Sequence, residues 1–374
     1  MASLYLHIPF CEKKCVYCDF YSIETLSPMK DFLDALHREI ALRTAFGMGT
    51  TFTTIFLGGG TPSLLHPHQL EKILSKLASC FSISSDAEVT LETNPGTVTE
   101  EKLRAYRSLG VNRLSIGVQS FHEDELRFLT RIHNAEQARQ CVQLARRTGF
   151  DNVSLDLIYA LPGQTLTRWE ATLRQAIALE PNHISAYSLI VEDGTPLARM
   201  VHAGIIAPLP DDVEATFYEF TMAFMQEHGF EHYEVSNYAK PGFRSRHNST
   251  YWRHDNYLGF GPSAHSFWKH TDTHARRWSN IAHLSHYCAT LRRGTLPIAY
   301  QEALGQNEIL AEEIFLGLRT DGVPLRTLQR HPSPPNNFIA RLVADGTALI
   351  EHDVLRLTPK GYLLCDEIAT HLMP

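Results

Sequence analysis

Short apolar runs alternate with amphipathic stretches over the first 230 residues of the chain. The runs are rich in β-branched residues and predict strands, and the stretches between them have helical spacing. The predicted strands cover 4–8, 52–57, 87–93, 112–118, 152–159 and 183–191. The predicted helices cover 29–46, 67–80, 99–109, 134–148 and 167–179. Six such units are too few for a full eight-unit barrel. The pattern therefore predicts an α/β fold, either an incomplete, open barrel or a doubly wound sheet.

The alternation ends near residue 230. Residues 231–300 are rich in His, Asn, Tyr and Trp and form a predicted extension. Residues 301–374 read as helices followed by a short hairpin and a last helix, which is typical of a small winged-helix-like module. Such modules often bind DNA, but the chain has a net charge of −7 and no long Lys/Arg block. We therefore expect no nucleic-acid partner and a packing or docking role for this module.

The composition narrows the class of protein further. The 374 residues are 44% hydrophobic and 20% charged, which is ordinary for a soluble globular chain of one large domain and one smaller one. The first ten residues do not resemble a secretory signal, and no apolar run approaches 18 residues. We expect a cytoplasmic protein.

Four of the seven cysteines are scattered and are predicted to be buried core residues: Cys80, Cys141, Cys288 and Cys365.

Special residues follow every predicted strand. "GGGTP" (58–62) follows the second strand, "ETNPG" (92–96) ends the third and "GVQS" (117–120) ends the fourth. "LPGQT" (161–165) and "EDGTP" (192–196) follow the last two. Glycine and proline also make ordinary turns, so many of these residues have a simpler explanation. In parallel α/β folds, however, functional sites gather at the carboxyl ends of strands, and we expect one shared site there.

Three cysteines follow the first strand, in "HIPFCEKKCVYCDF" (7–20). Cys11, Cys15 and Cys18 have the spacing C-x3-C-x2-C, and Phe20 stands where a fourth cysteine would fit. Structural zinc sites use four protein ligands, and His7 would have to supply the fourth. An iron–sulfur cluster held by three thiolates would leave one iron open to a small molecule. The spacing favours a metal site over inert thiols.

"CEKKCVYC" resembles the cluster loop of the radical S-adenosylmethionine (SAM) superfamily, and "GGGTP" resembles its glycine motif. The resemblance implies a [4Fe-4S] cluster on the three cysteines, with SAM chelating the fourth iron. It also implies an incomplete (β/α)6 radical-SAM barrel, to which the C-terminal winged-helix-like module is added. Glycine at the motif would let the backbone approach the charged ligand closely.

The segments "YLHIPFC", "FLGGGTPS", "SIGVQSF", "DLIYALPGQT", "SNYAKPG" and "LGFGPSAHS" resemble the oxygen-independent coproporphyrinogen III oxidase family, nearly end to end. The oxidase branch of that family carries a fourth nearby cysteine. The heme-chaperone branch carries "YCDF" and an H-N-x-x-Y-W motif. This chain has "YCDF" at 17–20 and "HNSTYW" at 247–252. The chain is therefore identified as a member of the heme-chaperone branch.

The resemblance also implies a set of cofactor contacts. The residues that match the family's SAM site are Tyr5, Tyr17, Gly59, Gly60, Thr61, Glu92, Gln119, Arg131, Asp156, Ile190 and His265. His265 stands where the oxidase branch has an aliphatic residue, so its contact is the least secure. Arg131 suits the methionine carboxylate, because a guanidinium pairs with a carboxylate through two parallel hydrogen bonds.

Without the resemblance, the chemistry of the residues supports some of these SAM contacts more strongly than others. Asp156 is an acid on an apolar strand, and a buried acid without a partner is costly, so we expect it to have a partner and a function. Arg131 could equally be a residue on a helix surface. Gln119 alone is uninformative.

The family motif implies heme contacts at His247, Asn248, Tyr251 and Trp252. By composition, His247 could ligate iron, Tyr251 and Trp252 could contact the ring, and Arg246 and Arg253 could pair with the propionates. An aromatic cluster with histidine is more often a packed loop, and the chain has no C-x-x-C-H motif for covalent heme attachment.

Two functions of different class follow. The first is a carrier that binds heme and hands it to acceptor hemoproteins, membrane-bound ones among them. The second is an enzyme, an oxygen-independent coproporphyrinogen III oxidase that cleaves SAM and decarboxylates coproporphyrinogen to protoporphyrinogen IX. Phe20 and "HNSTYW" favour the carrier, whereas the SAM contacts keep the enzyme open. The sequence leaves open whether SAM is cleaved and whether the chain forms a homodimer.

Overall fold

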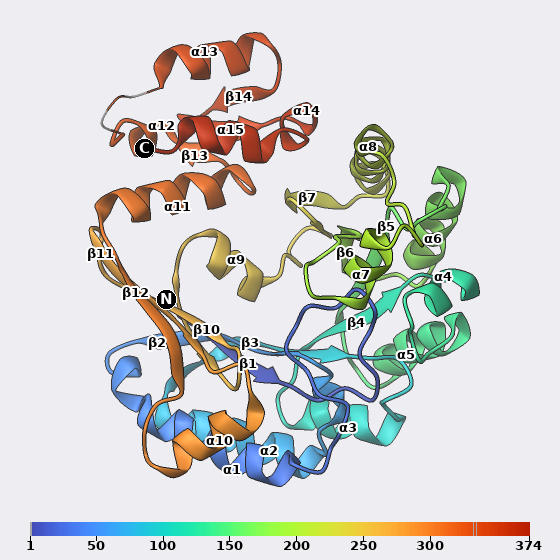
Figure 1. Cartoon of the computed structure of the whole chain (residues 1–374), viewed down its shortest axis with the longest axis vertical. Coiled ribbons are helices and arrows are strands. Elements are labelled where there is room, and N and C mark those ends of the chain that lie inside the picture. The colour runs from blue at the N-terminus through green and yellow to red at the C-terminus, as the bar shows by residue number, and fades with distance from the viewer. Residues whose placement is uncertain (1, 332, 334) are drawn as a thin grey trace.

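The computed structural model describes residues 2–331, 333 and 335–374. Its main feature is one large, mostly parallel sheet with helices along its outer face (Figure 1). The six strands of the repeating units are β1 (Ala2–Ile8), β2 (Thr51–Gly59), β3 (Ser82–Thr93), β4 (Arg113–Gln119), β5 (Asn152–Tyr159) and β6 (His183–Ser188). These strands pair in parallel and in sequence order. The predicted incomplete (β/α)6 barrel is confirmed.

Helices follow these strands, and most of them cover the outer face of the sheet. They are α1 (Met29–Leu42), α2 (Pro67–Cys80), α3 (Glu100–Ser108), α4 (Glu123–Phe128), α5 (Ala135–Arg147), α6 (Leu166–Ala178), α7 (Pro196–His202) and α8 (Asp211–Glu227). Several begin at the polar residues that helix starts favour. The Oδ1 atom of Asn134 accepts a hydrogen bond from the backbone N–H of Gln137 at 2.8 Å, and Gln137 reciprocates at 2.9 Å, which fixes the start of α5.

Two predicted elements run several residues past the ends of those observed. The first predicted helix, 29–46, ends at Leu42 and is followed by a 3-10 turn at Thr44–Gly47. The sixth predicted strand, 183–191, ends at Ser188, and Ile190 is 64% exposed beyond it. The apolar run 189–191 continues past the end of the strand, so hydrophobicity alone does not mark where the chain turns away there.

Residues 231–304 extend the same sheet at both edges. The added elements are β7 (Glu231–Glu234), β8 (Asn237–Ala239), α9 (Arg246–Trp252), β9 (Asn256–Phe260), β10 (His265–Thr271), β11 (His274–Asn280), α10 (Leu284–Arg292) and β12 (Ile298–Leu304). The sheet order is β12-β11-β10-β9-β1-β2-β3-β4-β5-β6-β8-β7. β9 is parallel to β1, whereas β10 to β12 and β7 to β8 pair antiparallel. The predicted extension is thus part of the barrel sheet.

The remaining residues form a small module with its own hydrophobic core. It contains α11 (Gln306–Leu318), β13 (Val323–Pro324), α12 (Leu325–Leu328), α13 (Asn336–Ala344), β14 (Ala348–Glu351), β15 (Val354–Leu357), α14 (Pro359–Tyr362) and α15 (Cys365–Leu372). Three short strands pair as β13-β15-β14. The predicted helices and hairpin of a winged-helix-like module are confirmed, and Figure 1 shows the module above α9.

The scattered cysteines lie in the core with one exception. Cys141, Cys288 and Cys365 are buried, as predicted. Cys80, at the end of α2, is only half-buried, because the last turn of that helix reaches the surface.

Candidate functional site

The three clustered cysteines lie on the loop that leaves the carboxyl end of β1. Cys11, Cys15 and Cys18 are free and half-buried. Two backbone hydrogen bonds close the base of the loop, from the N–H of Cys11 to the Ile23 carbonyl at 3.0 Å and from the N–H of Ile23 to the Pro9 carbonyl at 2.8 Å. The loop therefore holds all three thiols at the strand ends.

The thiols fit a multinuclear cluster better than a single ion. Among the described residues, no three His, Cys, Asp or Glu side chains form a group that could hold one metal ion. An iron–sulfur cluster differs because each thiolate binds a different iron, so the sulfurs need not converge on one point. Burial raises the pKa of the Cys11 thiol, and it raises the pKa of Cys18 to about 11. Bound iron cations would lower the pKa of these thiols again, because they stabilise the negatively charged thiolates.

The glycine motif packs against the cysteine loop. The N–H of Gly60 donates to the Ile8 carbonyl at 2.9 Å, and the N–H of Thr61 donates to the Phe10 carbonyl at 2.7 Å. A Cβ on Gly60 would lie 2.7 Å from the Phe10 carbonyl oxygen. Gly59 has φ +102°, and a Cβ there would lie 2.5 Å from the His7 ring. The structure thus gives these glycines a role that the sequence alone does not reveal: they let β2 and the cysteine loop touch.

Two buried acids lie at the same end of the sheet. Glu92, near the end of β3, accepts a hydrogen bond from the N–H of Gly59 at 3.2 Å. Burial, and then repulsion from Asp156, raises the pKa of Glu92 to about 8. Asp156, on β5, accepts from the Ser115 hydroxyl at 3.0 and 3.1 Å. Burial raises the pKa of Asp156. Asp156 has the partner that its sequence context predicts, although this partner carries no charge.

Arg131 joins the cysteine loop to the ends of β3 and β4. Its Nη1 donates to the Cys15 sulfur at 3.4 Å, and its Nη2 donates to the Gly117 carbonyl at 2.8 Å and to the Asn94 side chain. Its Nε is buried and has no hydrogen-bond partner among the residues that the structure describes. Arg131 lies between α4 and α5, not on a helix surface. Gln119 ends β4 in the left-handed region, with φ 68°, and is buried.

The aromatic candidates line the site from two sides. The Tyr5 hydroxyl is 3.1 Å from His7 Nδ1, and His7 Nε2 is 2.7 Å from the Tyr21 carbonyl. The carbonyl can only accept, so His7 carries its proton on Nε2 and accepts from Tyr5. Burial lowers the pKa of His7 to about 4, which keeps the ring neutral. Tyr17 belongs to a small apolar cluster with Leu129 and neighbouring residues.

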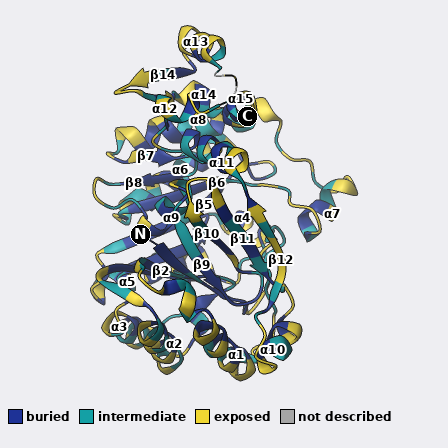
Figure 2. Cartoon of the chain, turned by 90° about the vertical axis from the view of Figure 1, so that its left-hand side faces the viewer, coloured by how far each residue is buried: buried dark blue, intermediate teal, exposed yellow. Residues whose placement is uncertain are grey.

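The last two SAM candidates are less well placed. Ile190 and His265 are both exposed, on the segment after β6 and at the start of β10. The segment that carries α7 stands out from the body (Figure 2) and is tied to the cysteine loop by a hydrogen bond from the N–H of Leu197 to the Val16 carbonyl at 2.9 Å. The structure therefore gathers the other candidates and leaves these two at the margin.

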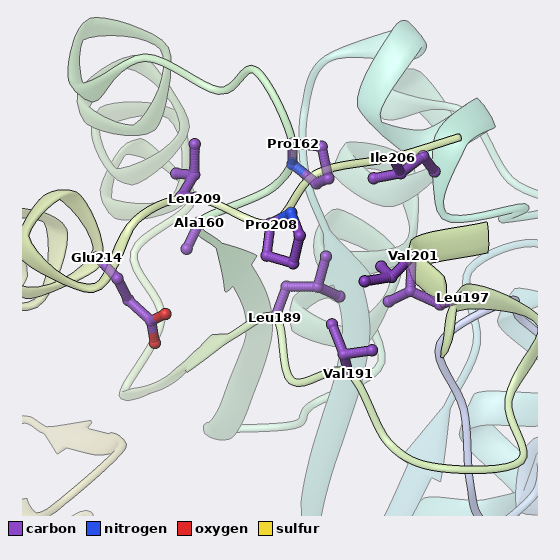
Figure 3. Close-up of a pocket in the computed structure, with 10 residues that line it drawn as sticks. All are labelled: Ala160, Pro162, Leu189, Val191, Leu197, Val201, Ile206, Pro208, Leu209 and Glu214. Carbon is purple, nitrogen blue, oxygen red and sulfur yellow. The ribbon is translucent and has the colours of Figure 1, made fainter. Parts of the chain in front are cut away.

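A small apolar cavity lies under the α7 segment, lined by Leu189, Leu197, Pro208 and neighbouring residues (Figure 3). Its volume is about 20 Å³, which is close to the space of one water molecule. This cavity is a packing defect between the segment and the barrel, and it is too small for a cofactor.

The H-N-x-x-Y-W motif forms most of α9, at the opposite end of the strands. The Thr54 hydroxyl is 2.7 Å from His247 Nδ1, and the Tyr251 hydroxyl is 2.8 Å from His247 Nε2. Ser3 and Thr250 share a hydrogen bond of 2.9 Å. Both ring nitrogens of His247 are thus engaged within the protein, and burial lowers its pKa to about 3. In this conformation His247 offers no free nitrogen to an iron atom.

Glu88 fixes the start of α9 from inside the barrel. Its carboxylate accepts hydrogen bonds from the N–H groups of Arg246 at 3.1 Å and His247 at 3.0 Å. Ser245 caps the same turn by accepting from the N–H of Asn248 at 3.2 Å. The role of Glu88 was not predicted from the sequence, because an acid in a strand does not indicate a hydrogen-bond partner 158 residues away. Trp252 is half-buried on the outer face of the helix.

No helix of the described residues has both the length and the apolar character needed to cross a membrane.

Comparisons with known proteins agree with this geometry. Residues 5–176 match the model of the radical SAM superfamily. The chain is 40% identical over 377 aligned residues to a Bacillus subtilis protein named heme chaperone HemW, covering 98% of each chain. It is also 40% identical to the protein of that name from Escherichia coli, covering 70% of this chain and 69% of the relative.

A solved structure extends the match to the whole fold. Coproporphyrinogen III oxidase (HemN) from Escherichia coli, described as a radical SAM enzyme, has a TM-score of 0.84 and 25% sequence identity. The alignment covers 100% of this chain and 90% of that one. The chain belongs to the radical SAM superfamily and, within it, to the family of proteins named heme chaperone HemW.

Proposed function

We propose that the chain binds heme and passes it to acceptor hemoproteins, with a [4Fe-4S] cluster and SAM at the carboxyl ends of its strands. The relatives that match along nearly the whole chain carry the name heme chaperone, which supports this reading. Membership of the radical SAM superfamily implies the cluster and SAM.

The chain's own residues suggest how these groups are held. Cys11, Cys15 and Cys18 would ligate three irons and leave the fourth for SAM. The unpartnered Nε of Arg131, beside Cys15, has a donor available for the methionine carboxylate. Glu92 and Asp156 would accept hydrogen bonds from the ammonium and ribose groups. When bound, the cluster and SAM supply one-electron chemistry at this end of the sheet.

The observation that carries the proposal is the distance between the two motifs. Ser3 contacts α9 and Ile8 leads into the cysteine loop, so the two motifs meet opposite ends of β1. At about 3.3 Å per residue, these strand positions are about 16 Å apart. Reacting atoms must approach to about 3–3.5 Å. A porphyrin held on the outer face of α9, away from the barrel interior into which His247 and Tyr251 project, would therefore not contact the cluster, which suits a carrier better than an oxidase.

The first test is an anaerobic heme titration of the reconstituted protein, followed by Soret absorbance. We expect saturable binding of one heme per chain, and heme transfer from the loaded protein to apomyoglobin as a generic acceptor. Absence of saturable binding would overturn the carrier function. If His247 ligates the iron after a rearrangement of α9, His247→Ala will shift the Soret band, and an unchanged band excludes that ligand.

The oxidase remains the second candidate because Arg131, Glu92 and Asp156 gather at the strand ends and the whole fold matches HemN. The same preparation is therefore incubated with coproporphyrinogen III, SAM and a reductant. Formation of protoporphyrinogen IX would favour the oxidase. Its absence, in protein that binds heme, would favour the carrier.

A further inference from the structure

The two faces of α9 have different surroundings. His247, Thr250 and Tyr251 point into the barrel, where they bond to Thr54, to Ser3 and to each other. The other face, with Arg246, Ser249, Trp252 and Arg253, lines a cavity of about 380 Å³. The residues of the H-N-x-x-Y-W motif therefore lie on both faces of α9. His247 and Tyr251 face the barrel, whereas Trp252 faces the cavity.

The opposite wall of this cavity comes from distant parts of the chain. Tyr233 and Arg244 come from β7 and from the segment before α9, and Thr320 and Asp321 come from the C-terminal module. The Tyr362 hydroxyl donates to the Thr320 carbonyl at 3.1 Å, which holds that wall in place. Figure 1 shows α9 between the barrel sheet and α11 of the module.

The charged residues of the cavity are three arginines and one carboxylate, that of Asp321. The guanidinium of Arg246 donates through Nη1 to Asp86, and that of Arg253 donates through Nε to Asp255. Arg244 uses Nε on Glu231 and Nη1 on Asp321. Within the described residues, Nη2 of all three arginines thus has no protein acceptor. A guanidinium with free N–H groups matches a carboxylate in geometry and charge.

We propose that this cavity binds the carboxylate edge of heme, with the propionates on Arg246, Arg253 and Arg244 and the ring against Trp252. The proposal rests on the proposed heme function and deepens it. The volume lies near the lower end of ligand pockets, about 300–1,000 Å³, which suits one edge of the macrocycle with the rest exposed for transfer. Asp321 competes with a propionate for Arg244, so the C-terminal module regulates access to the site.

The test compares heme with heme dimethyl ester, in which both carboxylates are blocked. Wild-type protein is expected to bind heme about tenfold more tightly than the ester. Arg246→Gln and Arg253→Gln are each expected to raise the Kd for heme by up to about tenfold and to leave the Kd for the ester unchanged. Arg104→Gln, on the far helix α3 and likewise paired with a carboxylate, is the matched control and should leave both affinities unchanged.

Asp321→Asn should change the affinity for heme in the opposite direction to the arginine variants. This variant removes the cavity's carboxylate, so it should bind heme more tightly than wild type and the ester equally well. Ester binding as tight as heme binding, or arginine variants with wild-type affinity, would overturn the cavity while leaving the carrier function intact. Absence of heme binding by the wild-type protein overturns both. Thermal unfolding of each variant confirms that it is folded.

Discussion

Glu234 is a buried carboxyl group whose environment opposes its charge. The residue is fully buried at the end of β7, before the turn to β8. One oxygen accepts a hydrogen bond from the N–H of Ser236 at 3.1 Å, and the other has no hydrogen-bond partner. Burial raises the pKa of Glu234 to about 8. The folded protein therefore keeps the proton on Glu234 at neutral pH, whereas the unfolded chain releases it above its ordinary pKa near 4.5.

Replacing Glu234 by glutamine should stabilise the protein at neutral pH. Because the pKa is raised in the folded state, the contribution of Glu234 to wild-type stability falls by about 1.4 kcal/mol for each pH increment of one between about 4.5 and about 8. Glutamine keeps the acceptor for Ser236 and does not titrate. Glu234→Gln should therefore gain stability over wild type across this window, and the gain should level off above pH 8. Urea unfolding at pH 5, 7 and 9 measures it.

The control for Glu234 is Glu227→Gln, a change of the same chemistry at an exposed position on α8. Its unfolding free energy should follow wild type at all three pH values. A Glu234→Gln variant whose stability also followed wild type would show that the buried carboxyl group finds a partner or water in solution.

Single residues were predictable where their chemistry is specific. The cysteines were identified by type and spacing, and Arg131, Glu92 and Asp156 by the resemblance to a known family. The structure gathers them at one end of the sheet. The roles of Tyr5 and His7 as a bonded pair were missed, as was Glu88 at the start of α9. These roles depend on which side chains meet across strands, and one sequence does not encode that in any local pattern.

At the scale of elements, the residue that follows β2, Gly60, packs closely against the start of the cysteine loop. Gly60→Ala would place a methyl group 2.7 Å from the Phe10 carbonyl oxygen and 2.8 Å from the Ile8 carbonyl oxygen. Backbone atoms cannot give way without moving the loop. We expect a loss of about 1–3 kcal/mol in unfolding free energy and a lower iron and sulfide content after reconstitution.

The matched substitution is Gly305→Ala, where the added methyl meets only the flexible carboxylate of Glu308 at 3.0 Å. That variant should reconstitute like wild type. Normal cluster content in Gly60→Ala would mean that the loop tolerates displacement and that the glycine is not needed to position the cysteines.

Elements were predicted well where hydrophobic periodicity and caps coincide. The strand predicted at 152–159 and the helix predicted at 67–80 agree with β5 and α2 to the residue. The short helix α9 was not predicted as an element. It has only seven residues, and its hydrogen bonds run to Ser3, Thr54 and Glu88, far away in sequence. Isolated helices of this length are marginal in water, so tertiary contacts decide its existence.

At the scale of the whole molecule, Glu312 joins the C-terminal module to the barrel sheet. Its carboxylate accepts from Arg277 Nη1 at 2.8 Å and pairs with His254 Nε2 at 2.8 Å. Burial opposes the charge of Glu312, but His254 and Arg277 outweigh it and lower the pKa of Glu312. A lowered pKa means that this stabilisation is present above the unfolded pKa near 4.5 and is lost as pH falls below it.

Glu312→Gln should therefore loosen the module at neutral pH, with a loss of about 1–3 kcal/mol. Hydrogen exchange of α11 at pH 7 should be faster in the variant, and the difference from wild type should shrink at acid pH. Glu100→Gln breaks an exposed glutamate–arginine pair on α3, which water and salt screen, and it is expected to leave the exchange of α11 unchanged. Equal exchange of α11 in Glu312→Gln and wild type would assign the docking to other contacts.

The overall architecture was only partly predictable. The six repeating units and the C-terminal module followed from periodicity, whereas the placement of 231–304 on both edges of one sheet did not. Local patterns define strands but not their neighbours, and β9 pairs with β1 across more than 250 residues.

This pairing has a consequence for the chain as it leaves the ribosome. β1 is complete within the first ten residues, but its partner β9 begins only at Asn256. At about 5–20 residues per second, β1 waits roughly 12–50 s with one edge unpaired. An open strand edge attracts other chains. During this time the open edge of β1 can pair with other chains unless it is covered. A substitution that slows synthesis before residue 256 would lengthen this exposure without altering the finished fold.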